Sequence, residues 1–163
     1  MLTDKQKNKA MVFLRQRQAD RNFEKGLCFC CGEYLDSEES FTDFTCGPVD
    51  KNVIMDMVRR IHLCDGSANV YIEVYDLEED DTESFIYAET MWIQTVLDMD
   101  RLKDLFEELN KDYGAYCSPD AMGVLSEESI HRYFLVNQVG ELIEMSTLLN
   151  TDGLKSLFYC WWD

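Results

Sequence analysis

The stretch that decides the fold is ANVYIEVYDL at residues 68–77, followed by EEDDTE at 78–83 and SFIYAETMWIQTV at 84–96. Its first part alternates between apolar and mixed positions with the period of two that is typical of a β-strand. The alternating residues are Val70, Ile72 and Val74 on one face and Tyr71, Glu73 and Tyr75 on the other. The third part is apolar on both sides, as in a central strand that is covered on both faces. The acidic segment between them predicts a protruding turn, so the two strands are expected to form a hairpin.

Apolar residues with i, i+3, i+4 spacing predict helices on either side of this hairpin. They are expected at about 3–25, from Asp50 to Asp65, from Asp98 or Asp100 to about 110, and from about Thr151 to the end. A loop is expected at 111–124, a helical turn near Ser126, and two short strands at 132–136 and 141–145. Together these elements predict one globular α+β domain over residues 1–163, with an antiparallel sheet of about four strands and helices packed on one side.

The composition excludes several classes of protein. The chain has 163 residues, of which 46% are hydrophobic, so it is long and apolar enough to form a core and is not a disordered acidic tail. With 15 basic and 32 acidic residues its formal charge is −17, which argues against direct binding to nucleic acid or to an anionic membrane. No apolar run approaches the roughly 18 residues that span a bilayer.

The cellular compartment follows from the N-terminus and the cysteines. The first ten residues are polar and lysine-rich and have no apolar core of a secretory signal. Seven cysteines, an odd number, do not indicate a disulfide framework, so reduced thiols are the simpler interpretation. These features predict a cytoplasmic protein.

The charge is distributed unevenly along the chain. Residues 1–26 contain seven basic and three acidic residues, whereas residues 61–100 contain no Lys or Arg. The basic face of the first predicted helix has three possible environments: the acidic body of the same chain, a neighbouring copy, or solvent. A solvated face is the favoured interpretation, because most charge runs on helices are solvated.

The cysteine-rich segment CFCCG at 28–32 contains half of a zinc-knuckle motif. Zinc needs four ligands, and the nearby candidates to join Cys28 and Cys31 are Cys46, His62 and Cys64, which form no second Cys-x-x-Cys pair. Small buried hydrophobes are the favoured role for these thiols. No metal and no cofactor are therefore predicted. Redox catalysis is also disfavoured, since the acidic residues that follow would raise the thiol pKa values.

Motifs of catalysis are missing from the sequence. It has no Gly-x-Ser-x-Gly elbow, phosphate-binding glycine loop, His-Glu-x-x-His pair or dinucleotide fingerprint. Only two histidines, His62 and His131, are present, and 32 acidic residues make any chosen carboxylate pair uninformative. The chain is predicted not to be an enzyme.

The strongest candidate for a functional surface is the central hairpin, where tyrosines and carboxylates lie together. Protein interfaces use rigid amphipathic tyrosines with charges that steer a partner of opposite sign. The predicted partner-binding residues are Tyr71, Glu73, Tyr75, Glu78, Glu79, Asp80, Asp81 and Glu83. A second acidic stretch at 33–43, around Tyr34, has a similar composition. The alternative is that a helix covers Tyr71 and Tyr75 and that the acidic residues only maintain solubility.

These features favour a cytoplasmic inhibitor of the immunity or antitoxin type, which neutralises a basic protein toxin such as a nuclease. In size, acidity and lack of catalytic motifs the chain resembles bacterial immunity proteins, although no sequence motif defines a family. Two alternatives are a zinc-stabilised protein-interaction domain and a nucleic-acid mimic. The oligomeric state, and whether the Phe158–Trp162 cluster is core or an exposed dimer patch, are left open by the sequence.

Overall fold

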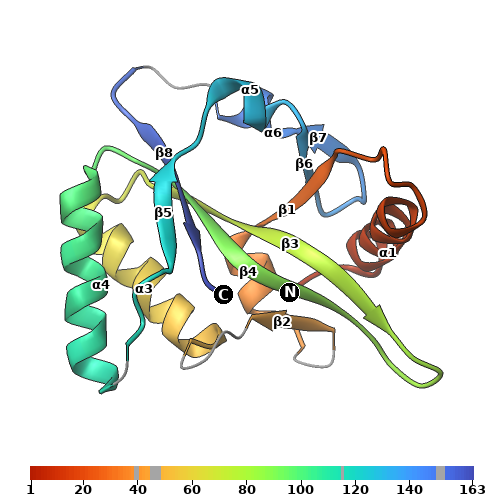
Figure 1. The fold of residues 1–163 in the computed structure, drawn as a ribbon, viewed down its shortest axis with the longest axis horizontal. Helices are drawn as coiled ribbons and strands as arrows, with labels where there is room; N and C mark the ends of the chain where they lie inside the picture. Colours follow the sequence, from red (N-terminus) through yellow and green to blue (C-terminus); the bar gives the residue numbers. More distant parts are fainter. Residues whose placement is uncertain (39–40, 45–48, 115, 150–152) are drawn as a thin grey trace.

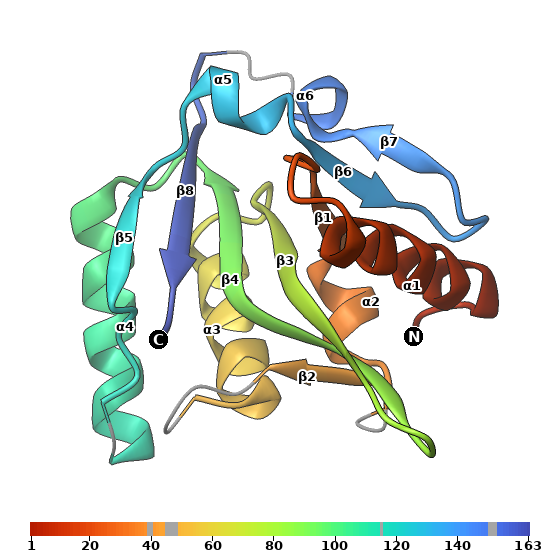
Figure 2. The same ribbon diagram turned by 45° about the vertical axis from the view of Figure 1, so that its right-hand side comes forward.

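The central hairpin forms as the alternation predicts. The computed structural model describes residues 1–38, 41–44, 49–114, 116–149 and 153–163. In it β3 (Asn69–Glu79) pairs antiparallel with β4 (Ser84–Thr95), and Tyr71 lies opposite Trp92. The register shifts around Val74, and we call the part of the hairpin beyond it, residues 75–87, the arm. β2 still borders the base of the arm, where it pairs with β4 at Ile86 and Tyr87. Only residues 78–85 project as two strands alone (Figure 2).

The prediction of about four antiparallel strands is wrong. The described residues form a mixed sheet of eight strands in the order β5-β8-β4-β3-β1-β6-β7, with β2 also paired to β4 (Figure 1). The β1–β6 and β2–β4 pairs are parallel. The two short strands predicted at 132–136 and 141–145 are present as β6 (Tyr133–Val136) and β7 (Leu142–Glu144). The further strands are β1 (Gly26–Cys30), β2 (Thr42–Phe44), β5 (Ala121–Val124) and β8 (Ser156–Trp161). Most of these strands are too short to show a periodicity of their own.

The C-terminal segment is a strand and not the predicted helix. β8 runs antiparallel between β4 and β5, so both of its faces are covered in part, and its apolar residues match the helical spacing only by coincidence. Phe158, Cys160 and Trp162 are buried in the core, while Tyr159 and Trp161 are half-buried on the other face. Residues 121–124, which were expected in a loop, form the outer partner of this strand.

Three of the four predicted long helices are present and begin at the predicted caps. α1 (Asp4–Ala19) starts with a capping box of Thr3 and Gln6, α3 (Lys51–Cys64) is capped by Asp50, and α4 (Met99–Tyr113) by Asp98. α1 ends at Ala19, six residues before the predicted end. The short helices are α2 (Cys31–Leu35), α5 (Glu127–Ile130) and α6 (Met145–Leu148).

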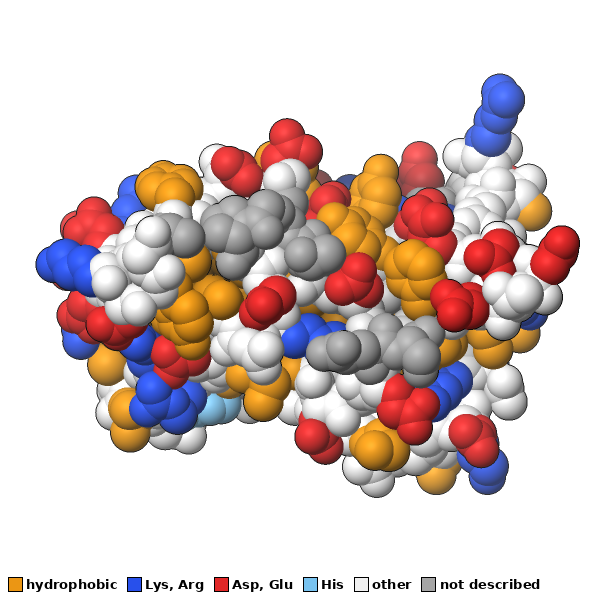
Figure 3. Space-filling view, turned by 90° about the horizontal axis from the view of Figure 1, so that it is seen from below, with side chains coloured by type: hydrophobic (Ala, Val, Ile, Leu, Met, Phe, Trp, Pro, Cys, Tyr) orange, Lys and Arg blue, Asp and Glu red, His pale blue; other side chains and the backbone are white. Residues whose placement is uncertain are grey.

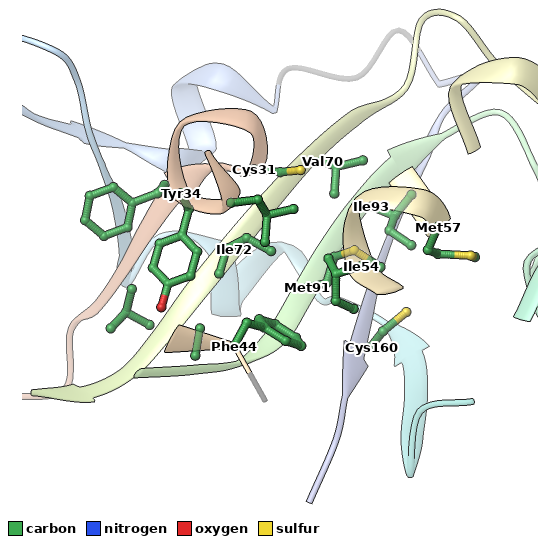
Figure 4. Close-up of a cluster of buried hydrophobic side chains, with 14 of the residues drawn as sticks. Cys31, Tyr34, Phe44, Ile54, Met57, Val70, Ile72, Met91, Ile93 and Cys160 are labelled. Carbon is green, nitrogen blue, oxygen red and sulfur yellow. The ribbon is translucent and has the colours of Figure 1, made fainter. Parts of the chain in front are cut away.

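The sheet carries a core on each face, which corrects the expectation that helices pack on one side only. In the larger core, the helices α1, α2, α3 and α4 pack on one face of the sheet. Figure 4 shows the centre of this core around Tyr34, Ile72 and Met91. A smaller cluster on the opposite face, with Trp92 fully buried, is covered by α5, α6 and their neighbouring loops. None of the described helices is both long and apolar enough to cross a membrane.

Asp65 connects the end of α3 to the end of β4. One carboxylate oxygen accepts hydrogen bonds from Thr95 Oγ1 at 2.6 Å and from the Val96 amide at 3.0 Å. The other accepts from the Ser67 amide at 3.0 Å and from Ser67 Oγ at 2.7 Å. Burial alone would raise the pKa of Asp65, but these hydrogen bonds outweigh it and hold the pKa well below its usual value. The ionised carboxylate is therefore part of the folded structure.

Candidate functional site

The tip of the hairpin presents five carboxylates, and we call residues 78–83 the acidic tip. Its turn is ordered by Asp80, whose Oδ1 accepts hydrogen bonds from the Thr82 amide at 2.7 Å and the Glu83 amide at 2.8 Å. These backbone hydrogen bonds lower the pKa of Asp80, so it stays ionised at neutral pH. The five carboxylates are thus held on a defined turn and not on an unstructured loop.

The basic face of α1 braces this arm. Arg15 forms a bidentate pair with Glu79, with Nη2–Oε1 at 2.5 Å and Nε–Oε2 at 3.2 Å. One turn further, the Gln18 side-chain amide donates to Asp76 Oδ1 at 2.7 Å and to the Leu77 carbonyl at 2.8 Å. Of the three environments left open by the sequence, this part of α1 docks on the acidic region of its own chain.

Three of the five carboxylates remain available to a partner. Glu78, Asp81 and Glu83 are exposed, and among the described residues none of them forms an ion pair. Behind them, Tyr75 is 55% exposed and meets the ring of Tyr87 edge-to-face at 6.3 Å between centroids. The arm therefore combines unpaired negative charge with a supported aromatic side chain. Tyr87 was not predicted, because only the pairing across the hairpin brings it to Tyr75.

Tyr71 and Glu73 lie on the same strand but not on this surface. Tyr71 is buried in the smaller core, on the face covered by α5 and α6. Glu73 is half-buried beside it and accepts a hydrogen bond from Trp92 Nε1 at 3.1 Å. Burial raises the pKa of Glu73, although hydrogen bonds from Trp92 and Tyr133 act in the opposite direction. Of the predicted partner-binding residues, the structure thus brings together Tyr75 and the five acidic residues.

We predict that Glu73→Gln raises the free energy of unfolding at pH 7 by roughly 1 kcal/mol, because it removes a partly buried charge and keeps an acceptor for Trp92. The folded pKa of Glu73 lies above its unfolded value, so the wild type loses stability as pH rises through these values. The variant lacks this loss, and the two proteins should converge at acidic pH. Urea unfolding between pH 4 and pH 8 measures the difference. Equal stability of both proteins at every pH would contradict it.

The second acidic stretch does not form a comparable surface in its described part. Tyr34 is fully buried, and its hydroxyl donates to the backbone carbonyls of Asp43 at 2.7 Å and Ile86 at 3.1 Å. This tyrosine belongs to the core and is not a partner contact. Glu39 lies outside the described residues.

The cysteines with zinc-ligand spacing do not lie together in the structure. Cys28 packs in the smaller core and Cys31 in the larger one, on the opposite face of the sheet, while Cys64 is exposed. His62 Nε2 lies 3.0 Å from the Ala68 carbonyl oxygen, and Cys46 falls outside the described residues. Within the part of the chain that the structure describes, no three His, Cys, Asp or Glu side chains are grouped to hold a metal ion. Burial raises the pKa of the Cys28 and Cys31 thiols, which leaves them protonated at neutral pH.

Acidic side chains are spread over the face that is seen from below. Several of them lie at the right-hand end of the molecule, the end at which Figure 1 places the hairpin tip (Figure 3). Comparison with models of protein families, with curated proteins and with solved structures finds no match for this chain. The arm is therefore the feature of the molecule from which we infer a function.

Proposed function

We propose that this protein is a cytoplasmic inhibitor of the immunity or antitoxin type, whose hairpin arm enters a basic cleft on a protein toxin such as a nuclease. The observation that carries the proposal is the projecting arm, on which Glu78, Asp81 and Glu83 are exposed and unpaired beside the half-exposed Tyr75. The narrow two-stranded end of the arm, residues 78–85, can enter a concave site that a flat surface cannot, with Tyr75 at its base. Its carboxylates take the places that substrate phosphates occupy in such a cleft.

The overall charge supports the same function. A formal charge of −17 attracts a basic partner over long range and accelerates association, which is important when the target is toxic to its own cell. The arm then supplies a local, ordered contact that salt screens less than the long-range field. The tyrosine adds an apolar anchor of the kind that dominates interface energetics.

A compact cleft fits the arm better than the binding track of a DNA-binding protein. A DNA mimic needs carboxylates spaced along an extended surface to match successive phosphates. The unpaired acidic residues of the tip lie within one turn, between residues 78 and 83. The zinc-stabilised interaction domain is disfavoured, because Cys28 and Cys31 pack in different cores.

The proposal is tested by capture followed by a functional assay. Tagged protein is incubated with lysate of its source cells at low salt, eluted with a salt step, and the eluted proteins are identified by mass. We expect a basic protein that is toxic or nucleolytic when purified alone and inactive at a 1:1 ratio with this chain. If the captured protein keeps its activity when saturated with the chain, the inhibitor function is wrong. Competition by duplex DNA without inhibition would instead favour the nucleic-acid mimic.

A further inference from the structure

A second concave site lies beside the sheet, away from the acidic tip. It is a pocket of about 350 Å³ between the end of α1, the loop that leads into β1, and the start of β6. Its wall is mostly polar and includes three cationic side chains, Arg17, Lys25 and Arg132. They come from three separate segments, so the fold and not a local sequence run brings them together.

Among the described residues the three cations form no short ion pair, although the protein has twice as many acidic as basic residues. Arg17 nevertheless lies near enough to Glu73 to lower the pKa of that carboxyl. Lys25 instead lies over the rings of Phe134 at 5.5 Å and Phe23 at 6.0 Å. Glu24, at the exposed rim, is the one other charged residue of the wall besides Glu73. With three cations against two carboxylates, the pocket wall has a small excess of positive charge on a strongly negative protein.

The inner wall of the pocket is formed by Glu73 and Tyr133. Glu73 is held by the Trp92 indole, and a hydrogen bond also links it to Tyr133. The ring of Tyr133 covers Gly26, where an added Cβ would lie 2.2 Å from its Cε1 atom. The carboxyl of Glu73 can accept hydrogen bonds from hydroxyl groups of a ligand, and the hydroxyl of Tyr133 can donate hydrogen bonds to them.

We propose that this pocket binds a small phosphate monoester with a hydroxylated organic part, of the sugar-phosphate class. Two guanidinium groups and an ammonium group match the charge and the hydrogen-bonding pattern of a phosphate dianion. The volume exceeds that of phosphate alone and lies at the lower end of the range for small-molecule sites. A small ligand is favoured over a polyanion, since the net charge of −17 repels an extended phosphate chain.

Isothermal titration with ribose 5-phosphate, inorganic phosphate and unphosphorylated ribose tests this proposal. We expect saturable 1:1 binding of ribose 5-phosphate, weaker binding of phosphate, and no binding of ribose. Arg17→Gln and Arg132→Gln should each weaken ribose 5-phosphate binding by about tenfold or more, as expected for loss of a charge-assisted hydrogen bond. The control is Arg21→Gln, which makes the same change of charge on an exposed residue outside the pocket and should leave the affinity unchanged.

Three results would overturn the proposal. The first is no saturable binding of ribose 5-phosphate at about 10 mM, well above the Kd range of weak small-molecule sites. The second is equal weakening by Arg21→Gln and Arg132→Gln, which would indicate a non-specific charge effect. The third is equal affinity for phosphate and ribose 5-phosphate, which would exclude the role of Glu73 and Tyr133 toward hydroxyl groups. The inhibitor proposal does not depend on any of these results, because the acidic tip is not part of the pocket.

Discussion

Replacing Asp65 by asparagine is expected to lower the free energy of unfolding by about 2–4 kcal/mol at neutral pH. The carboxylate accepts four hydrogen bonds in the folded protein, from Thr95, Val96 and Ser67. An amide group has one acceptor oxygen, so the substitution leaves donors at the ends of α3 and β4 without partners. Urea unfolding measures the loss, and the exposed Asp81→Asn is the matched control, with a change below about 0.5 kcal/mol.

The same residue gives the protein a defined response to acid. The folded pKa of Asp65 lies below its unfolded value, so its contribution is complete above the unfolded pKa and is lost as pH falls toward the folded pKa. The difference between wild type and Asp65→Asn should therefore be largest at neutral pH and should shrink on acidification. A constant difference from pH 7 to pH 3 would show that the charge of Asp65 does not stabilise the fold.

Neutralising the unpaired part of the acidic tip is expected to slow association with the basic partner by about tenfold at low salt. The variant is Glu78→Gln/Asp81→Asn/Glu83→Gln. It spares Glu79, which anchors the arm to Arg15, and Asp80, which orders the turn. The arm should therefore keep its shape while it loses three charges. Circular dichroism and urea unfolding should show a protein as stable as the wild type.

We expect the association rate to depend on where these charges lie and not only on the net charge of the protein. A matched variant, which loses the same number of charges elsewhere, distinguishes the two. Asp104→Asn/Glu107→Gln/Glu108→Gln removes three charges from the exposed side of α4, which lies at the end of the molecule away from the arm (Figure 2). It also removes the exposed Arg101–Glu108 pair at 3.6 Å, which contributes little to stability. The association rate of this variant should fall only slightly, because it loses only the attraction that depends on total charge.

Much of the central architecture is predictable from local patterns. The alternation in 68–77 identifies β3, the two-sided apolar run identifies β4, and the caps Thr3, Asp50 and Asp98 mark the starts of three helices. These signals are strong because each is complete within about 15 residues. The acidic tip is predictable for the same reason, since adjacent carboxylates favour an exposed turn.

The errors share one cause, which is that pairing between distant segments has no local signature. β2 is a short strand that exists because β4 offers a free edge, and β8 is a strand because it fits between β4 and β5. β6 and β7 are predicted at 132–136 and 141–145, but the parallel pairing of β6 with β1 is not. At the site, alternation assigned Tyr71 and Glu73 to one face of β3 but did not reveal that α5 and α6 cover that part of the face. The contact of Arg15 with Glu79 likewise depends on tertiary structure. The excess of basic residues in the first 26 positions is the one feature of the sequence that indicates it.

The most direct test of the central claim is the association rate with the captured basic partner, measured by stopped-flow fluorescence over a series of salt concentrations. Wild type, the three-charge tip variant and the three-charge α4 variant are compared. We expect the tip variant to associate more slowly at low salt and to show a flatter dependence on salt, while the α4 variant stays close to the wild type. Equal rates and equal salt dependence for the two variants would contradict this expectation, because the arm would then be no more than one part of a negative surface.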